Sequence, residues 1–220
     1  PSAAPVVRSA LNLLLLLAGI HFLVDTVACI VSPLWPSLET RMGLSNGQVL
    51  GLFVVWTLTT SFGQFFVACF ADRWQSGWLV WFGPLVALIC MSSLGFATTP
   101  VGIALLLLLG GLGVASFHPE AAARAGACLP ERRSRAMSVF ALGGYLGQSV
   151  GPLYSGWMTD THGMRGLGWG IPFGVCLIVV AYLAWGHETS QPPTESEKKS
   201  LPLRRVLEGR IGPVLLLILV

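Results

Sequence analysis

Six long apolar runs constrain the fold of this chain more than any other feature of its sequence. The runs cover Leu11 to Val31, Gly47 to Ala71, Trp78 to Ala97, Val101 to Ala123, Ala136 to Met158, and Leu167 to Trp185. Each is close to the roughly 20 residues that a helix needs to cross a bilayer. Of all residues 54% are hydrophobic and 10% are charged, against about 25% charged residues in an average soluble domain. An ordinary soluble enzyme is therefore excluded, and we expect an all-α membrane protein.

The end of the sequence predicts how the chain is divided. A seventh apolar run occupies only residues 211–220, and ten helical residues rise about 15 Å, half of the hydrocarbon thickness. Residues 188–210 are polar and contain prolines, which is typical of a linker outside the membrane. We expect a six-helix transmembrane domain in residues 1–187, a cytoplasmic linker in 188–210 and the start of a seventh helix in 211–220. A second half, in the same or another chain, would complete the bundle.

Basic residues predict the orientation in the membrane. If the N-terminus is cytoplasmic, eleven of the 13 Lys and Arg residues lie on the inner side, and only Arg41 and Arg165 lie outside. This asymmetry follows the positive-inside rule. We therefore expect a multi-pass protein of the cell inner (plasma) membrane with a cytoplasmic N-terminus. The net charge of +3 then reflects topology, and no nucleic-acid partner is expected.

Two pairs of ionisable residues within the runs are the candidate proton-coupling site and substrate path. Charged side chains in a bilayer usually face a cavity or a partner. His21 and Asp25 are four residues apart, hence on one helix face near the middle of the membrane, where they can share a proton. The alternative is a local hydrogen bond that only fixes helix packing.

The second pair is His118 and Glu120 in the fourth run. Counting the helical rise from the run ends separates Glu120 and Asp25 by about 14 Å in depth, too far for a shared-proton dyad. By the same count His118 lies within about 6 Å of the depth of His21, so both histidines are expected to line one cavity. An ion pair between Glu120 and Arg124, four residues apart, is the structural alternative for Glu120.

These pairs also hint at internal symmetry. The first and fourth runs each carry a histidine with a carboxylate nearby, and these are the first helices of two successive triplets. Because three helices are an odd number, the second triplet must start on the opposite side of the membrane. We therefore expect a 3+3 inverted repeat.

Other polar and small residues complete the candidate set. Trp35, Gln64, Tyr145 and Gln148 are candidate cavity-lining residues. In the fifth run, glycines 143, 147 and 151 recur every four residues before Pro152, a pattern that lets another helix approach closely. The sequence has no phosphate-binding loop, metal-ligand spacing or nucleophile with an adjacent base. We therefore expect no enzyme activity, no metal and no cofactor.

Two motifs resemble those of the major facilitator superfamily. Asp72 and Arg73, in a short turn expected at residues 71–77, resemble the gating loop between helices two and three. Gly147, Gly151, Pro152 and Gly156 resemble the fifth-helix antiporter motif G-x-x-x-G-P-x-x-G-G, with Ser155 in place of one glycine. The resemblance implies the N-terminal half of a twelve-helix major facilitator fold with alternating access.

A narrower resemblance comes from three motifs together. His21-x-x-x-Asp25, the block of residues 117–120 (FHPE) and the lead-in at residues 143–147 (GGYLG) are similar to the fosmidomycin-resistance branch of that superfamily. The chain departs from the wider family at Ala68 and Gln75, where the loop motif has glycine, and it lacks the fourth-helix arginine of many drug antiporters.

These observations lead to one main hypothesis and two alternatives. The main hypothesis is a secondary transporter that exports a small-molecule drug or metabolite by proton antiport, driven by the proton gradient without a cofactor. The first alternative is proton-coupled uptake by symport, which uses the same residues. The second is a non-transporting, half-length assembly subunit. The expected partners are the substrate, protons, the lipid bilayer and the C-terminal six-helix half.

Overall fold

The computed structural model describes residues 4–74 and 77–189, with side chains described for 9–67 and 77–186. All regular elements within these ranges are helical. The elements are α1 (Ala4–Cys29), η1 (Ser32–Leu34), α2 (Trp35–Met42), α3 (Asn46–Trp74), α4 (Leu79–Ser92), η2 (Leu94–Phe96), α5 (Pro100–Cys128), η3 (Pro130–Arg132), α6 (Arg133–His162), η4 (Met164–Trp169) and α7 (Gly170–Thr189). The predicted linker beyond residue 189 and the predicted seventh helix lie outside the described residues.

Five stretches of the described chain are long and apolar enough to cross a membrane. They are Ser9–Met42, Asn46–Val67, Leu79–Phe96, Pro100–Cys128 and Met164–Gly186. They match five of the six predicted runs. The remaining run lies in α6, which has 30 residues and therefore sufficient length, but its glycines and hydroxyl side chains lower its hydropathy. That α6 crosses the membrane stays a prediction.

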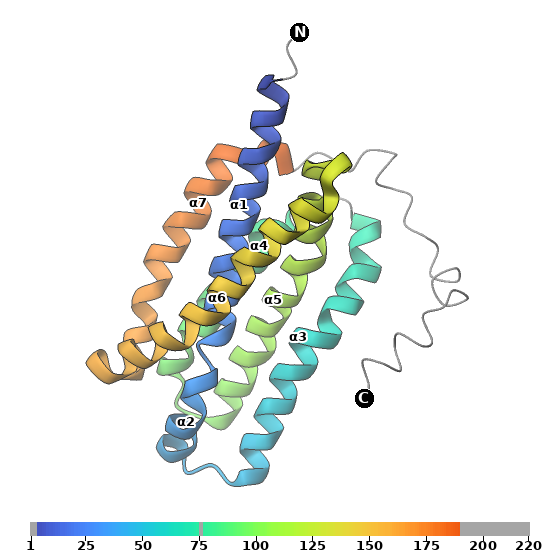
Figure 1. Cartoon of the computed structure of the whole chain (residues 1–220). Coiled ribbons are helices and arrows are strands. Elements are labelled where there is room, and N and C mark those ends of the chain that lie inside the picture. Colours follow the sequence, from blue (N-terminus) through green and yellow to red (C-terminus); the bar gives the residue numbers. More distant parts are fainter. Residues whose placement is uncertain (1–3, 75–76, 190–220) are drawn as a thin grey trace.

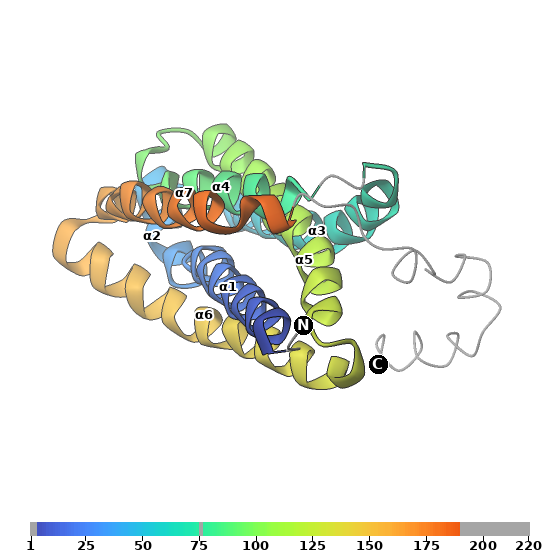
Figure 2. The same ribbon diagram turned by 90° about the horizontal axis from the view of Figure 1, so that it is seen from above.

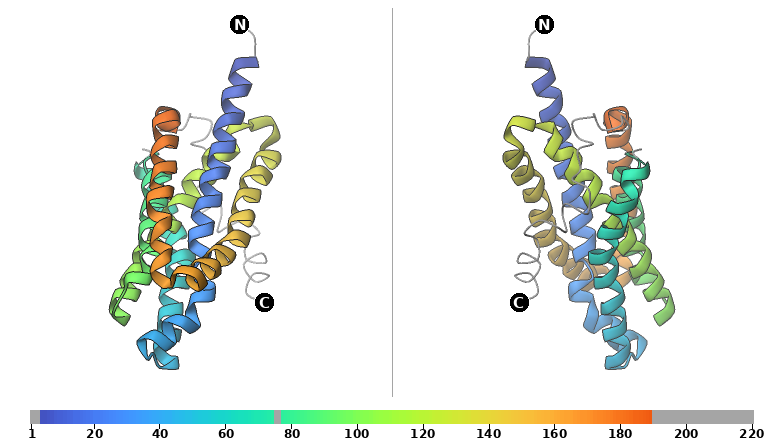
Figure 3. Two further views of the ribbon diagram at one scale, coloured as in Figure 1. Left: turned by 90° about the vertical axis from the view of Figure 1, so that its left-hand side faces the viewer. Right: turned by 90° about the vertical axis from the view of Figure 1, so that its right-hand side faces the viewer.

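Helix α1 lies at the centre of the packing. Figures 2 and 3 show α1 between α6 on one side and α4 and α7 on the other. It packs against α4, α5, α6 and α7, whereas α3 packs mainly along α5 (Figure 1). Leu14, Leu17 and Val24 of α1 are fully buried. Functional side chains on α1 are therefore positioned by four neighbouring helices at once.

Glycines on α6 set how closely it approaches α1. A Cβ atom added at Gly143, Gly147 or Gly151 would collide with the α1 backbone. The carbonyl oxygens it would meet belong to Ala18, Phe22 and Thr26, respectively. The two helices thus touch backbone to backbone along three successive turns, which is the packing that small residues permit in membranes. Gly156, the last glycine of the motif, has nothing within 4 Å of such a Cβ.

The predicted turn at residues 71–77 is shorter than expected. Helix α3 continues through Asp72 and Arg73 and ends at Trp74. The segment after Gly63 contains no glycine or proline before Gly77 that would end the helix earlier. Both residues therefore lie in the last turn of a helix, and the prediction that they form a loop is wrong in this respect.

Candidate functional site

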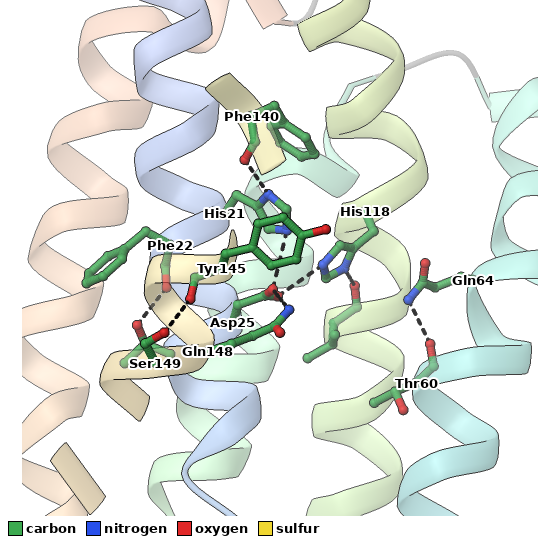
Figure 4. Close-up of polar contacts among 12 residues, drawn as sticks. His21, Phe22, Asp25, Thr60, Gln64, His118, Phe140, Tyr145, Gln148 and Ser149 are labelled. Carbon is green, nitrogen blue, oxygen red and sulfur yellow. Dashed lines mark hydrogen bonds and ion pairs between the residues drawn. The ribbon is translucent and has the colours of Figure 1, made fainter. Parts of the chain in front are cut away.

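A buried carboxylate is the centre of the candidate site. Asp25 of α1 is 5% exposed, and its two oxygens receive contacts from three side chains. His118 Nε2 of α5 lies 3.1 Å from Oδ1, and His21 Nε2 lies 3.5 Å from Oδ2. The amide of Gln148 on α6 donates a hydrogen bond of 2.8 Å to Oδ2 (Figure 4). The cluster of His21, Asp25, His118 and Gln148 therefore joins α1, α5 and α6.

Backbone carbonyls hold both imidazole rings in the orientation that faces Asp25. His21 Nδ1 donates to the carbonyl oxygen of Phe140 at 2.9 Å, and His118 Nδ1 donates to that of Val114 at 2.8 Å. Because a carbonyl oxygen only accepts, each Nδ1 must carry the proton. The two rings also meet edge to face at 4.9 Å, and the His21 ring stacks on Phe140 at 4.2 Å. Both Nε2 atoms therefore point to the carboxylate.

Gly144 lies directly against this cluster. A Cβ atom added there would lie 2.5 Å from His21 Nε2 and 2.9 Å from Asp25 Oδ2. The glycine spacing predicts helix packing for Gly143, Gly147 and Gly151 but no role at the site for Gly144. The pair Gly143–Gly144 is the signal in the sequence, because Gly144 does not belong to the four-residue repeat.

Glu120 lies outside the cluster. Arg124 Nη2 is 2.7 Å and its Nε 2.8 Å from Glu120 Oε1, so the two residues form a close ion pair on α5. The ion pair with Arg124, which was the structural alternative for Glu120, is therefore present. His118 lies closer to Asp25 than the helical rise counted from the ends of the apolar runs predicts. Those ends are not the helix ends, because α1 begins at Ala4 and α5 continues to Cys128.

The candidate cavity-lining residues differ in their surroundings. Trp35 begins α2 and its ring meets that of Phe53, with centroids 6.1 Å apart. The Gln64 amide donates to the Thr60 carbonyl of its own helix at 2.9 Å (Figure 4). Tyr145 is 67% exposed. Of the four, only Gln148 is brought into the cluster.

The described residues also form a separate, half-open cavity of about 520 Å³. Its lining is mainly apolar and comes from α1, α4, α6 and α7, including Leu23, Leu88 and Phe173. None of the four cluster side chains belongs to this lining as described. The polar site and the apolar cavity are therefore distinct features of the helix bundle.

Chemically, the cluster combines groups that exchange protons and bind cations. One ligand-type atom from each of His21, Asp25 and His118 lies within 4.8 Å of the others. All three residues belong to the candidate site predicted from the sequence, but the direct contact of His118 with Asp25, 93 residues away, could not be predicted from spacing. The expectation of no bound metal stays untested.

Comparison with models of known protein families identifies the family of this chain. The Major Facilitator Superfamily model matches residues 14–220. The chain belongs to this superfamily. Membership supports the prediction of a multi-pass membrane protein, and it points to a superfamily of transporters rather than of enzymes.

Individual relatives within the superfamily are distant. The fosmidomycin resistance protein of Escherichia coli (strain K12) is 25% identical over 173 residues, 79% of this chain and 43% of that protein. The uncharacterized MFS-type transporter YfnC of Bacillus subtilis (strain 168) is 27% identical over 157 residues, 71% of this chain and 38% of that protein. The efflux pump radE of Floropilus chiversii is 37% identical over 75 residues, 34% of this chain and 14% of that protein. The match thus covers less than half of the length of each of these relatives. The resemblance to the fosmidomycin-resistance branch agrees with the first of them.

Proposed function

We propose that this chain forms the N-terminal six-helix half of a twelve-helix exporter that moves a small molecule outward by proton antiport and alternating access. The observation that carries the proposal is the Asp25 carboxylate facing two imidazoles whose Nδ1 atoms are already hydrogen-bonded to the backbone. A buried ionisable group in a membrane is costly and marks a transport pathway by default.

The hydrogen bonds restrict where protons can be in this cluster. A neutral imidazole that is protonated at Nδ1 presents a bare lone pair at Nε2. Two such lone pairs would face the carboxylate oxygens at 3.1 and 3.5 Å, an unfavourable arrangement of acceptors. A proton in one contact removes the repulsion there, and a second proton removes it in the other contact. One shared proton makes the cluster neutral, and a second leaves it with one positive charge, so the geometry favours a proton-loaded state.

Coupling to substrate would follow from the position of His118. Its side chain is 19% exposed, against 7% for Asp25, so it provides the more accessible edge of the cluster. Because the contacts with Asp25 cross from α1 to α5 and α6, a rocking motion would alter them and with them the preferred number of protons. We assign proton exchange to Asp25, His21 and His118, and leave Glu120 at the inner side of the path.

The membrane arrangement is part of the same proposal. We count α6 as a membrane span because it is 30 residues long and packs backbone to backbone on α1. The 3+3 inverted repeat is supported by the meeting of α1 and α5, the first helices of the two triplets, at Asp25. The asymmetry of basic residues supports a cytoplasmic N-terminus in the inner membrane. Exposed apolar side chains along α3, including Phe62 and Phe65, would meet lipid or the C-terminal half.

The direction of transport is proposed from the names of two relatives, a resistance protein and an efflux pump. Export of fosmidomycin, the compound in the first name, is the natural assay. Everted membrane vesicles that contain the full-length protein should accumulate fosmidomycin faster when an inward-acidic pH gradient is imposed. Asp25→Asn should abolish this acceleration, because the amide cannot bind and release the coupling proton.

Asp160→Asn is the matched control, since the same substitution is made on an exposed residue near the end of α6. It should retain the wild-type acceleration. Gradient-driven export by Asp25→Asn at the wild-type rate would contradict the proposed coupling. Gradient-driven movement in the opposite direction would support the symport alternative.

A further inference from the structure

The cluster that would bind protons also has the features of a metal site. We infer that His21, Asp25 and His118 bind a single divalent transition-metal ion, of the Zn²⁺, Co²⁺ and Ni²⁺ class, in place of the shared protons. The inference uses the residues of the proposed function but concerns binding alone, which can be measured without substrate or gradient.

The spacing of the ligand atoms is close to that around a bound ion. Zinc binds imidazole nitrogen and carboxylate oxygen at about 2.0–2.2 Å, so neighbouring ligands of a tetrahedral ion are about 3.4 Å apart. His118 Nε2 lies 3.1 Å from Oδ1 of Asp25, and His21 Nε2 lies 3.5 Å from Oδ2, so each nitrogen is at about this spacing from one of the two carboxylate oxygens. One ligand atom from each of the three residues lies within 4.8 Å of the others.

The surrounding hydrogen bonds are those that metal-binding histidines require. Such histidines usually donate the ring N–H that does not bind metal to a carbonyl or carboxylate, which fixes the tautomer and the ring orientation. His21 and His118 both do so, through Phe140 and Val114. The Gln148 amide similarly holds the carboxylate through Oδ2. The nitrogen lone pairs are thus aimed at the position where an ion would lie.

Gly144 lies directly against two of the three ligand side chains. A Cβ atom there would lie 2.5 Å from His21 Nε2 and 2.9 Å from Asp25 Oδ2. The ligand atoms can therefore occupy their positions only because residue 144 has no side chain. An alanine at this position would displace both ligand atoms without removing either of them.

The donor set and charge select the class of ion. Two imidazole nitrogens and one carboxylate oxygen suit transition metals, whereas Mg²⁺ and Ca²⁺ prefer oxygen ligands. A divalent ion with the Asp25 carboxylate leaves one positive charge, the same as the doubly protonated cluster. Binding should therefore release the protons that the ion displaces.

The test is a titration of the purified full-length protein in detergent with Co²⁺, followed by its visible absorption, and with Zn²⁺ by calorimetry. We expect one high-affinity ion per chain, with proton release into a weakly buffered solution. Asp25→Asn, His118→Gln and Gly144→Ala should each weaken binding by about 100-fold. The matched control is His162→Gln, which removes an exposed histidine at the end of α6 and should leave binding unchanged.

A variant with a different metal ligand distinguishes loss of binding from loss of folding. His118→Cys should still bind Co²⁺ and add a thiolate-to-metal charge-transfer band that the wild type lacks. No specific Co²⁺ or Zn²⁺ binding by folded wild-type protein would overturn the inference, as would unchanged affinity in Asp25→Asn and His118→Gln. Metal binding without proton-coupled export would refute only the proposed function, and export without metal binding would refute only this inference.

Discussion

The contact between α6 and α1 allows a quantitative test with a control on the same helix. Replacing Gly147 by alanine would place its Cβ against the carbonyl oxygen of Phe22, 2.9 Å from the Thr26 nitrogen and 3.1 Å from Asp25 Cβ. Two of these are backbone atoms of a helix, which cannot rotate away as a side chain can. The helices must separate instead, and such overpacking typically costs about 1–3 kcal/mol.

The gain in helix propensity complicates a single measurement. Alanine is favoured over glycine by about 1 kcal/mol within a helix, which partly offsets the clash. Gly156→Ala gives the same gain on α6 with nothing within 4 Å of the new Cβ. The difference between the two variants therefore isolates the packing cost, and we expect Gly147→Ala to be less stable than Gly156→Ala by about 1–3 kcal/mol.

Thermal unfolding of the two purified variants in the same detergent would measure this difference. The reasoning would be refuted if Gly147→Ala matched or exceeded Gly156→Ala in stability. The clash also displaces α1 beside Asp25, so gradient-driven export should fall in Gly147→Ala and persist in Gly156→Ala.

Two further predictions concern hydrogen bonds between elements. Ser155, at the position where the family motif has glycine, donates to the Ile30 carbonyl at 2.8 Å and is fully buried. Ser155→Ala should lower the free energy of unfolding by about 1 kcal/mol. An unchanged midpoint of thermal unfolding would show that the hydrogen bond contributes nothing. Arg41 donates to the carbonyls of Gly95 and Ala97 at 2.9 and 3.0 Å. A lysine in its place has no planar group that can bind both acceptors, so Arg41→Lys should make the connection before α5 more sensitive to limited proteolysis. Equal cleavage rates in the two proteins would contradict this role.

Much of the candidate site could be found from local spacing alone. His21 and Asp25 are one helical turn apart, so any helix through this run brings them to one face. The same holds for Glu120 and Arg124, whose ion pair was one of the two alternatives considered. Such pairs depend only on the geometry of one helix, and an ionisable residue in an apolar run is conspicuous in the sequence.

Partners from other helices could not be found in this way. His118 and Gln148 lie 93 and 123 residues from Asp25, and the depth count from the ends of the apolar runs was too coarse to predict contact. The importance of Gly144 could not be predicted, because it depends on which side chains of the neighbouring helix lie opposite this residue. Trp35 and Gln64 have polar groups of the expected kind, yet the fold directs them to other neighbours.

The helical, membrane-spanning character of the chain could therefore be predicted from the sequence alone, because the bilayer imposes helix length and the exclusion of charge on each segment separately. The orientation that the basic residues indicate stays a prediction. Which faces of α1, α5 and α6 meet at Asp25 depends on how the helices pack. Lipid tails are as apolar as the helices, so hydropathy does not choose a helix partner. That choice depends on close contacts such as those of Gly143, Gly147 and Gly151, which exist only once the helices are packed.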